Sequence, residues 1–149
     1  MGVEFKASGF QKRIREMRAR APVEAEAFVT ELTNQGLTAA KALCPVDSGE
    51  LRLSLLPEPV GMKDGEITGG YATNSDHALF VEYGTGQRGL SGAVANGAEK
   101  DPEPVDYRED WPGMPAQPYM YPSVKSLEEN LPETLKKLGQ KIIGGAGSA

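Results

Sequence analysis

Residues 77–86 (HALFVEYGTG) constrain the fold more than any other stretch of this chain. The six residues Ala78–Tyr83 form a short apolar run rich in β-forming residues, and a Gly-Thr-Gly turn follows it. This pattern predicts a strand buried on both faces. Glu82 is the exception within the run, because a carboxylate there must be paired, or must face a partner or solvent. We expect the rest of the chain to pack around this segment.

The N-terminal third predicts a long helical region in two parts. Residues 9–20 are polar, with Phe10, Ile14 and Met17 spaced along one face of a short amphipathic helix. Pro22 is predicted to interrupt this helix and to begin a second one.

The second helix is predicted to run to about Leu43 and to have one narrow packing face. Gly36 lies on this face and costs up to about 1 kcal/mol relative to alanine in a helix, so we expect another element to approach closely there. The face consists of Val29, Leu32, Gly36, Ala39 and Leu43.

A three-stranded antiparallel meander is predicted next. Leu51, Leu53 and Leu55 alternate with polar residues, which indicates a strand with one buried face. The sequence KDGE at residues 63–66 is typical of a hairpin turn, and residues 67–71 continue the second strand. The run at residues 78–83 is the expected third strand.

Residues 86–118 are rich in glycine and proline and show no periodicity, which predicts a long loop. Trp111, the only tryptophan, lies within it. Two interpretations of this side chain remain open: docking onto a partner or neighbouring subunit, or folding back over the chain's own core.

A C-terminal helix completes the expected fold. Pro132 is predicted to kink or split it, and residues 144–149 form a tail of small residues. Together these patterns predict a single α+β domain over residues 1–149, with the last helix packed on the sheet. The apolar positions of this helix are Val124, Leu127, Leu131, Leu135, Leu138 and Ile142.

Composition indicates an interior that is small for the chain's length. The 149 residues are 39% hydrophobic and include 18 glycines and 11 prolines, so we expect part of the apolar surface to be buried against other copies or partners. No apolar run approaches 18 residues and no charged-then-apolar leader is present, so we expect neither a membrane span nor a secretion signal.

Charge is unevenly distributed. Residues 1–20 have a balance of +4, in a chain whose total is −5. The basic segment at residues 6–20 could bind nucleic acid phosphates, or could be a solvated or partner-facing helix; the acidic remainder argues against a dedicated nucleic-acid binder. The main acidic cluster is Glu99, Asp101, Glu103, Asp106, Glu109 and Asp110.

The sequence offers little support for catalysis. Cys44 and His77 could form a cysteine nucleophile, but Cys44 follows a predicted helix C-terminus, where the dipole raises the pKa of a thiol. A metal site would combine His77 with carboxylates such as Asp47, Glu50 and Asp76, yet the chain has no HxxxH or CxxC pair. The glycine-rich segments lack the lysine of a phosphate-binding loop. We therefore expect no enzyme activity, cofactor or metal. The single cysteine fits a reducing cytoplasm during folding.

Three ordered segments resemble a known family. They are CPVDSGELRLSL at residues 44–55, HALFVEYGTG at residues 77–86 and PAQPYMYPS at residues 115–123. Together they resemble the tailed-bacteriophage neck and minor tail-component family, with its pattern PVDTG-LR-S, YA-YVEFGT and QPFLRPA. Ser48 replaces the usual threonine, Tyr83 the usual phenylalanine, and Glu50 a basic or polar residue. The loop at residues 86–118 would be an insertion.

The resemblance implies a structural virion protein, assembled in the host cytoplasm, that forms a ring in the neck and joins head to tail. Six copies are favoured over twelve. Adjacent neck and tail proteins would be partners, and DNA would pass through the lumen without sequence recognition. A tail terminator that caps the tail tube is the alternative within the same class. The residues expected to hold the fold or the subunit contacts are Asp47, Arg52, Glu82 and Tyr83, with Trp111, Tyr119 and Tyr121 as further interface candidates.

Overall fold

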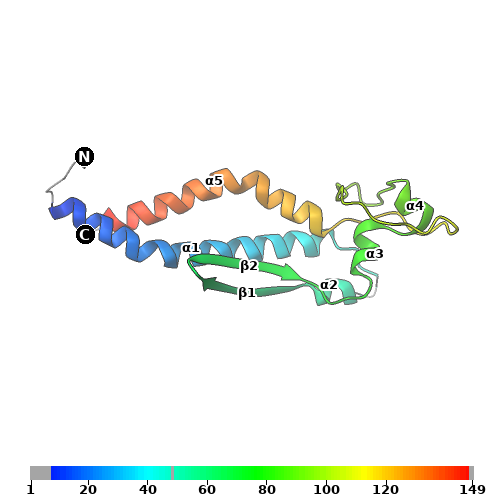
Figure 1. Cartoon of the computed structure of the whole chain (residues 1–149), viewed down its shortest axis with the longest axis horizontal. Helices are drawn as coiled ribbons and strands as arrows, with labels where there is room; N and C mark the ends of the chain where they lie inside the picture. The colour runs from blue at the N-terminus through cyan, green and yellow to red at the C-terminus, as the bar shows by residue number, and fades with distance from the viewer. Residues whose placement is uncertain (1–7, 48, 148–149) are drawn as a thin grey trace.

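A computed structural model describes residues 8–47 and 49–147, and the fold is α+β (Figure 1). Two long helices, which we call the arm, pack along each other, and a β-hairpin packs on the first of them. Three short helices and an irregular segment complete the chain. The elements are α1 (Ser8–Leu43), α2 (Glu50–Ser54), β1 (Leu56–Lys63), β2 (Glu66–Ala72), α3 (Ala78–Tyr83), α4 (Gly86–Leu90) and α5 (Met120–Gly147).

The arm has two different ends. α1 begins and α5 ends at one of them, whereas α3, α4 and residues 91–119 gather at the other (Figure 1). We call this second group the distal lobe. Side chains of residues 8–14 and 145–147 are not described, so the basic residues Lys6, Lys12 and Arg13, and most of the expected tail at 144–149, lie outside the described side chains. No described helix combines the length and apolar composition needed to cross a bilayer.

The predicted three-stranded meander is wrong, because the described residues form a sheet of two strands. The segment predicted as its third strand, buried on both faces, is helix α3. In a helix, Val81 and Glu82 face inward, while Leu79 and Phe80 are 69% and 54% exposed. Gly84, at φ 77° and ψ −179°, ends this helix in a backbone conformation that essentially only glycine adopts. Tertiary packing has overridden the β-propensity of the run.

The strand predicted at Leu51, Leu53 and Leu55 is also wrong. Residues 50–54 form helix α2, which buries Leu55 just after its end and leaves Leu53 78% exposed. The strand β1 begins only at Leu56. The three alternating leucines therefore lie in one turn of helix and at its C-cap.

The hairpin prediction is confirmed. Asp64 and Gly65 form a two-residue turn between β1 and β2, with φ angles of 52° and 79°. Two successive positive φ angles are the requirement of a type I′ turn, which Asp-Gly meets at low cost. A bulge between Glu58 and Gly61 contains Pro59, the second of the two prolines of β1.

The two long helices are less interrupted than their prolines predict. α1 is one helix of 36 residues that contains Pro22, so the predicted break is wrong. α5 starts at Met120 and contains Pro132 without splitting, and it bows away from α1 (Figure 1). α5 packs along α1 rather than on the sheet. The hydroxyls of Tyr71 and Ser123, 2.6 Å apart, connect it to β2.

Gly36 lies where α1, β2 and α5 meet, which confirms the predicted close approach of another element at this position. A Cβ atom built on Gly36 would overlap the ring of Tyr71 and approach Leu127 Cδ1 to 2.8 Å. The small core lies beside this crossing and consists of Leu37, Ala40, Cys44, Leu55 and Tyr119. Its residues Leu37, Ala40 and Cys44 each lie one position after a residue of the predicted packing face, because α1 also packs on the hairpin.

Substitution of Gly36 by alanine is expected to destabilise the protein by about 1–3 kcal/mol, although alanine is the better helix former. The added methyl group must displace the Tyr71 ring and with it the bond to Ser123. Gly139→Ala on α5 is the matched control, since nothing lies within 4 Å of its Cβ position; it should stabilise by up to about 1 kcal/mol. Urea denaturation measures the change in the free energy of unfolding of both variants. A more stable Gly36→Ala variant would contradict the packing described.

Candidate functional site

Glu82 caps the N-terminus of α5 from a different element. Its side chain is 6% exposed. One carboxylate oxygen, Oε2, accepts hydrogen bonds from the backbone N–H groups of Tyr119 and Met120, at 2.8 and 2.9 Å, and Oε1 accepts one from Tyr121 at 2.9 Å. Pro122, the next residue, has no N–H group. The carboxylate therefore satisfies the N–H groups that the first turn of a helix leaves without partners.

This cap joins the second and third sequence segments of the family pattern. Two further bonds run in parallel with it: Gln117 N–H donates to Val81 O at 2.7 Å, and the Tyr119 hydroxyl donates to Ala78 O at 3.2 Å. Tyr119 is 1% exposed, and burial raises the pKa of its hydroxyl, with Glu82 as a second cause. α3 is thus fixed to the start of α5 along its whole inner side.

Tyr83 holds the irregular segment of the distal lobe. Its hydroxyl donates a hydrogen bond to Asp101 Oδ2 at 3.1 Å. Its backbone oxygen accepts one from the Tyr107 hydroxyl at 2.9 Å. Burial and the neighbouring Asp101 carboxylate raise the pKa of Tyr83 to about 12. Tyr107 was not singled out from the sequence, where it is one more aromatic residue in a loop.

The loop at residues 86–118 folds back over its own chain. Its first residues form α4, and Thr85 and Met114 exchange two backbone hydrogen bonds of 2.9 and 3.1 Å. Gln87 N–H donates to Trp111 O at 2.9 Å. The Trp111 side chain is nevertheless 47% exposed. Its backbone therefore serves the fold, while its indole remains accessible.

The outer side of α3 carries exposed apolar side chains. Two grooves of about 590 and 540 Å³ flank it and share Phe80, Thr85 and Trp111. Leu79 and Val105 line the second groove. We call the side chains Leu79, Phe80, Val105 and Trp111 the α3 surface. Sequence reasoning missed Leu79 and Phe80, because a strand with two buried faces would have hidden both.

The remaining predicted site residues lie apart from one another. Asp47 and Arg52 are both exposed, and Asp47 lines the 590 Å³ groove. Tyr121 is partly buried in the first turn of α5, with Lys125 Nζ 5.5 Å from its ring centre.

Cys44 and His77 are not brought together in one cavity. Cys44 is 4% exposed, and burial raises the pKa of its thiol. His77 lines the 590 Å³ groove with Asp47 and Glu50, but Cys44 does not. Within the described part of the chain, no three His, Cys, Asp or Glu side chains gather as metal ligands would.

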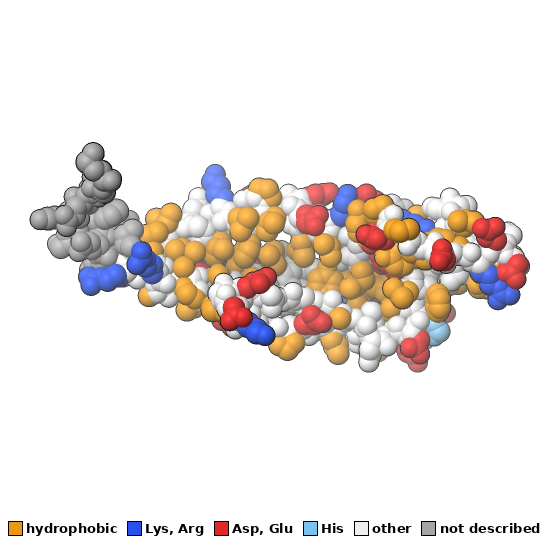
Figure 2. All heavy atoms as spheres, viewed as in Figure 1, with side chains coloured by type: hydrophobic (Ala, Val, Ile, Leu, Met, Phe, Trp, Pro, Cys, Tyr) orange, Lys and Arg blue, Asp and Glu red, His pale blue; other side chains and the backbone are white. Residues whose placement is uncertain are grey.

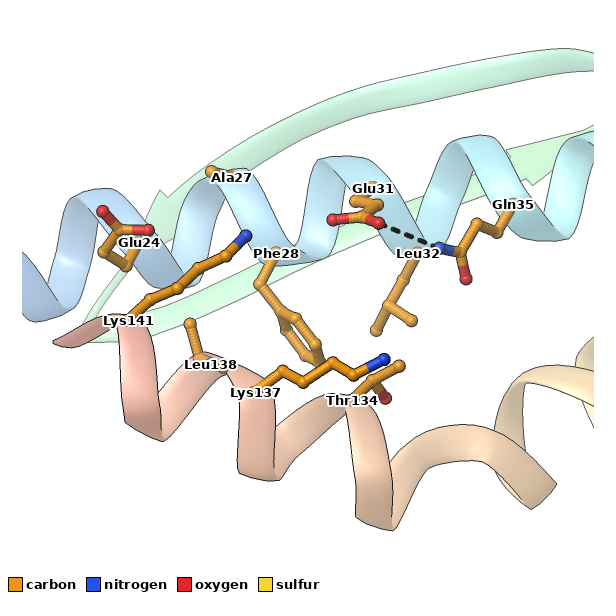
Figure 3. Close-up of a pocket in the computed structure, with 10 residues that line it drawn as sticks. All are labelled: Glu24, Ala27, Phe28, Glu31, Leu32, Gln35, Thr134, Lys137, Leu138 and Lys141. Carbon is orange, nitrogen blue, oxygen red and sulfur yellow. Dashed lines mark hydrogen bonds between the residues drawn. The ribbon is translucent and has the colours of Figure 1, made fainter. Parts of the chain in front are cut away.

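A smaller cavity of about 190 Å³ lies between α1 and α5 (Figure 3). Phe28, Leu32 and Leu138 form its apolar wall, Lys141 extends from α5 towards α1, and Lys137 runs along α5 towards Thr134. Lys137 also pairs with Glu133 at 3.7 Å. The cavity is the partly filled interior of the arm, where α5 bows away.

The comparison with known families covers the first of the three sequence segments and most of the second, but not the third. The model of the family described as "Bacteriophage HK97-gp10, putative tail-component" matches residues 8–84. No curated protein and no solved structure matches the chain. The matched part covers α1 to α3 and leaves out most of the distal lobe and α5. Because the match covers more than half of the chain, the protein belongs to the HK97-gp10-like family of bacteriophage tail components.

Proposed function

We propose that this tail component forms a homo-oligomeric ring in the phage neck, where it joins head to tail around the DNA channel. Six copies per ring are favoured over twelve, and the adjacent neck and tail proteins are its other partners. The role is structural, with no reaction catalysed. The family match supports a phage structural protein, and the surface of the isolated chain supports assembly.

The observation that carries the proposal is the size of that surface. The chain exposes 10293 Å², whereas a compact monomer of 15.9 kDa exposes about 7,300 Å². The excess is roughly 3,000 Å². A ring that covered the whole of this excess would bury about 3,000 Å² of total area at each of a subunit's two interfaces. That value lies within the range of about 2,000–5,000 Å² for obligate interfaces.

The distribution of burial supports the same proposal. No residue from 15 to 32 of α1 is fully buried, and neither is any residue from 124 to 144 of α5. Hydrophobic side chains remain exposed along the arm and on the distal lobe (Figure 2). Neighbouring copies would cover them. The net charge of −5 would let DNA move through a lumen, because like charges repel.

Electron micrographs of phage particles that lack this protein provide the test. The proposal expects full heads and free tails, and rings of the purified chain alone or with its neck neighbours. Tail tubes of uncontrolled length would instead indicate the terminator role. A protein that stays monomeric and never enters particles would contradict both.

Nucleic-acid binding through residues 6–20 is the second candidate. It is favoured by Arg15 and Arg18, which are both exposed on α1. Filter binding across a salt series distinguishes it, because phosphate contacts weaken steeply as salt rises. No binding at low salt would exclude it.

A further inference from the structure

We propose that the basic beginning of α1 in one subunit docks on the α3 surface of the next subunit. This inference rests on the proposed ring and names its subunit contact. The two surfaces lie at opposite ends of the same molecule (Figure 1). A contact between unlike surfaces is the head-to-tail type that can close into a ring.

The receiving surface is an apolar groove whose charged lining residues are Asp106 and Arg108. Leu79, Phe80, Val105 and Trp111 line the 540 Å³ groove and are 69%, 54%, 39% and 47% exposed. The Arg108 guanidinium pairs with Asp110, whereas the Asp106 carboxylate is exposed and forms no ion pair within the described residues. An exposed apolar groove of this kind suits the side of an amphipathic helix.

Only some of the acidic side chains in the cluster have an ion-pair or hydrogen-bond partner among the described residues of the same chain. Glu99 pairs with Lys125 at 3.2 Å, and Asp110 with Arg108 at 2.6 Å. Asp101 accepts the Tyr83 hydroxyl. Glu103, Asp106 and Glu109 are exposed and form no ion pair within the described residues.

The docking segment carries the opposite charge. Arg15 and Arg18 are exposed, lie one helical turn apart, and form no ion pair among the residues described. Arg20 pairs with Glu24 at 3.3 Å. The sequence of residues 9–20 is amphipathic as well as basic, so it offers the apolar groove an apolar partner.

These charges cannot neutralise each other within one copy. α1 rises about 1.5 Å per residue, so Arg18 lies roughly 38 Å from Leu43, and the distal lobe lies beyond that end (Figures 1 and 2). The Debye length at physiological salt is about 8 Å. The attraction therefore acts between copies, where it would set their register and speed their encounter.

Cross-linking of variants that each carry one added cysteine tests the contact directly. Arg18→Cys and Asp106→Cys are made in separate full-length chains, and the native Cys44 is 4% exposed and does not compete. The two variants are mixed and treated with a short bis-maleimide. The expected yield of cross-linked heterodimer is at least fivefold that of the control pair, and it should fall in 500 mM salt. The control pairs Asp106→Cys with Glu128→Cys, an exposed position on α5. A yield equal to the control would overturn the inference.

Charge-reversal variants test this contact separately from the proposal that the protein forms a ring. Arg15→Glu with Arg18→Glu, and Glu103→Arg with Asp106→Arg, are each expected to weaken self-association at least tenfold, and an equimolar mixture of the two variants should restore heterotypic association. Unchanged rings in both variants would overturn the contact and leave the proposed function standing. Wild-type chains that never associate, alone or in particles, would overturn the proposed function as well.

Discussion

Substitution of Glu82 by alanine is expected to destabilise the protein by about 3–5 kcal/mol, because three backbone N–H groups, one buried and two partly buried, lose their acceptor at once. The donors are the backbone N–H groups of Tyr119, Met120 and Tyr121, and the carboxylate accepts all three within 2.9 Å. Bonds to a charged group contribute more than neutral ones, and the helix dipole adds to them. No other side chain of the described residues bonds these groups.

Urea denaturation followed by circular dichroism measures this cost. Glu82→Gln should fall between the wild type and Glu82→Ala, since the amide keeps one acceptor oxygen and turns a donor towards another N–H group. Glu128→Ala is the control, because Glu128 is exposed on the same helix and should change stability by less than about 0.5 kcal/mol. Equal losses in Glu82→Ala and Glu128→Ala would show that the cap does not hold α5 in place.

The features that the sequence predicted correctly depend on neighbours in the chain. The hairpin follows from Asp64 and Gly65, which accept positive φ angles at the turn. The long helices follow from their apolar periodicity. Gly36 predicted a close approach because its helix cost needed a reason, although the partners, Tyr71 and Leu127, are 35 and 91 residues away.

The wrong predictions concern short segments whose conformation is decided by distant partners. α3 has only six residues, too few for a helical period to outweigh their β-propensity. Its helix is stabilised by Glu82, Val81 and Ala78, all bonded to residues 117–121. The carboxylate in an apolar run signalled that Glu82 needs a partner, but nothing local showed that the partner is the first turn of α5.

The acidic and apolar parts of the candidate assembly surface were visible separately in the sequence. The acidic cluster and Trp111 were recognised within the loop, and the basic segment at the other end of the chain. Their arrangement was not, because it depends on the loop folding back over α3. That fold-back brings Val105 and Trp111 beside Leu79 and Phe80.

The fold-back is expected to depend on Gly113, and Gly113→Ala should cost about 3 kcal/mol or more. Gly113 has φ 67°, and a Cβ atom there would overlap the carbonyl group of Thr85 and lie 2.7 Å from Gly86 N. The residues in contact are backbone, so the chain crossing must open rather than a side chain rotate. The bonds between Thr85 and Met114 would be lost with it.

Gly97→Ala is the matched control for this substitution. Gly97 has a similar φ of 70° but nothing within 4 Å of its Cβ position, so it should lose only about 1–2 kcal/mol for the left-handed conformation. Urea denaturation and hydrogen exchange at the amides of Thr85 and Met114 compare the two variants. Equal losses of stability in the two variants would mean that backbone strain alone accounts for the effect of Gly113→Ala. A larger cost with faster exchange would show that the crossing at Thr85 holds the loop, and the α3 surface with it, in place.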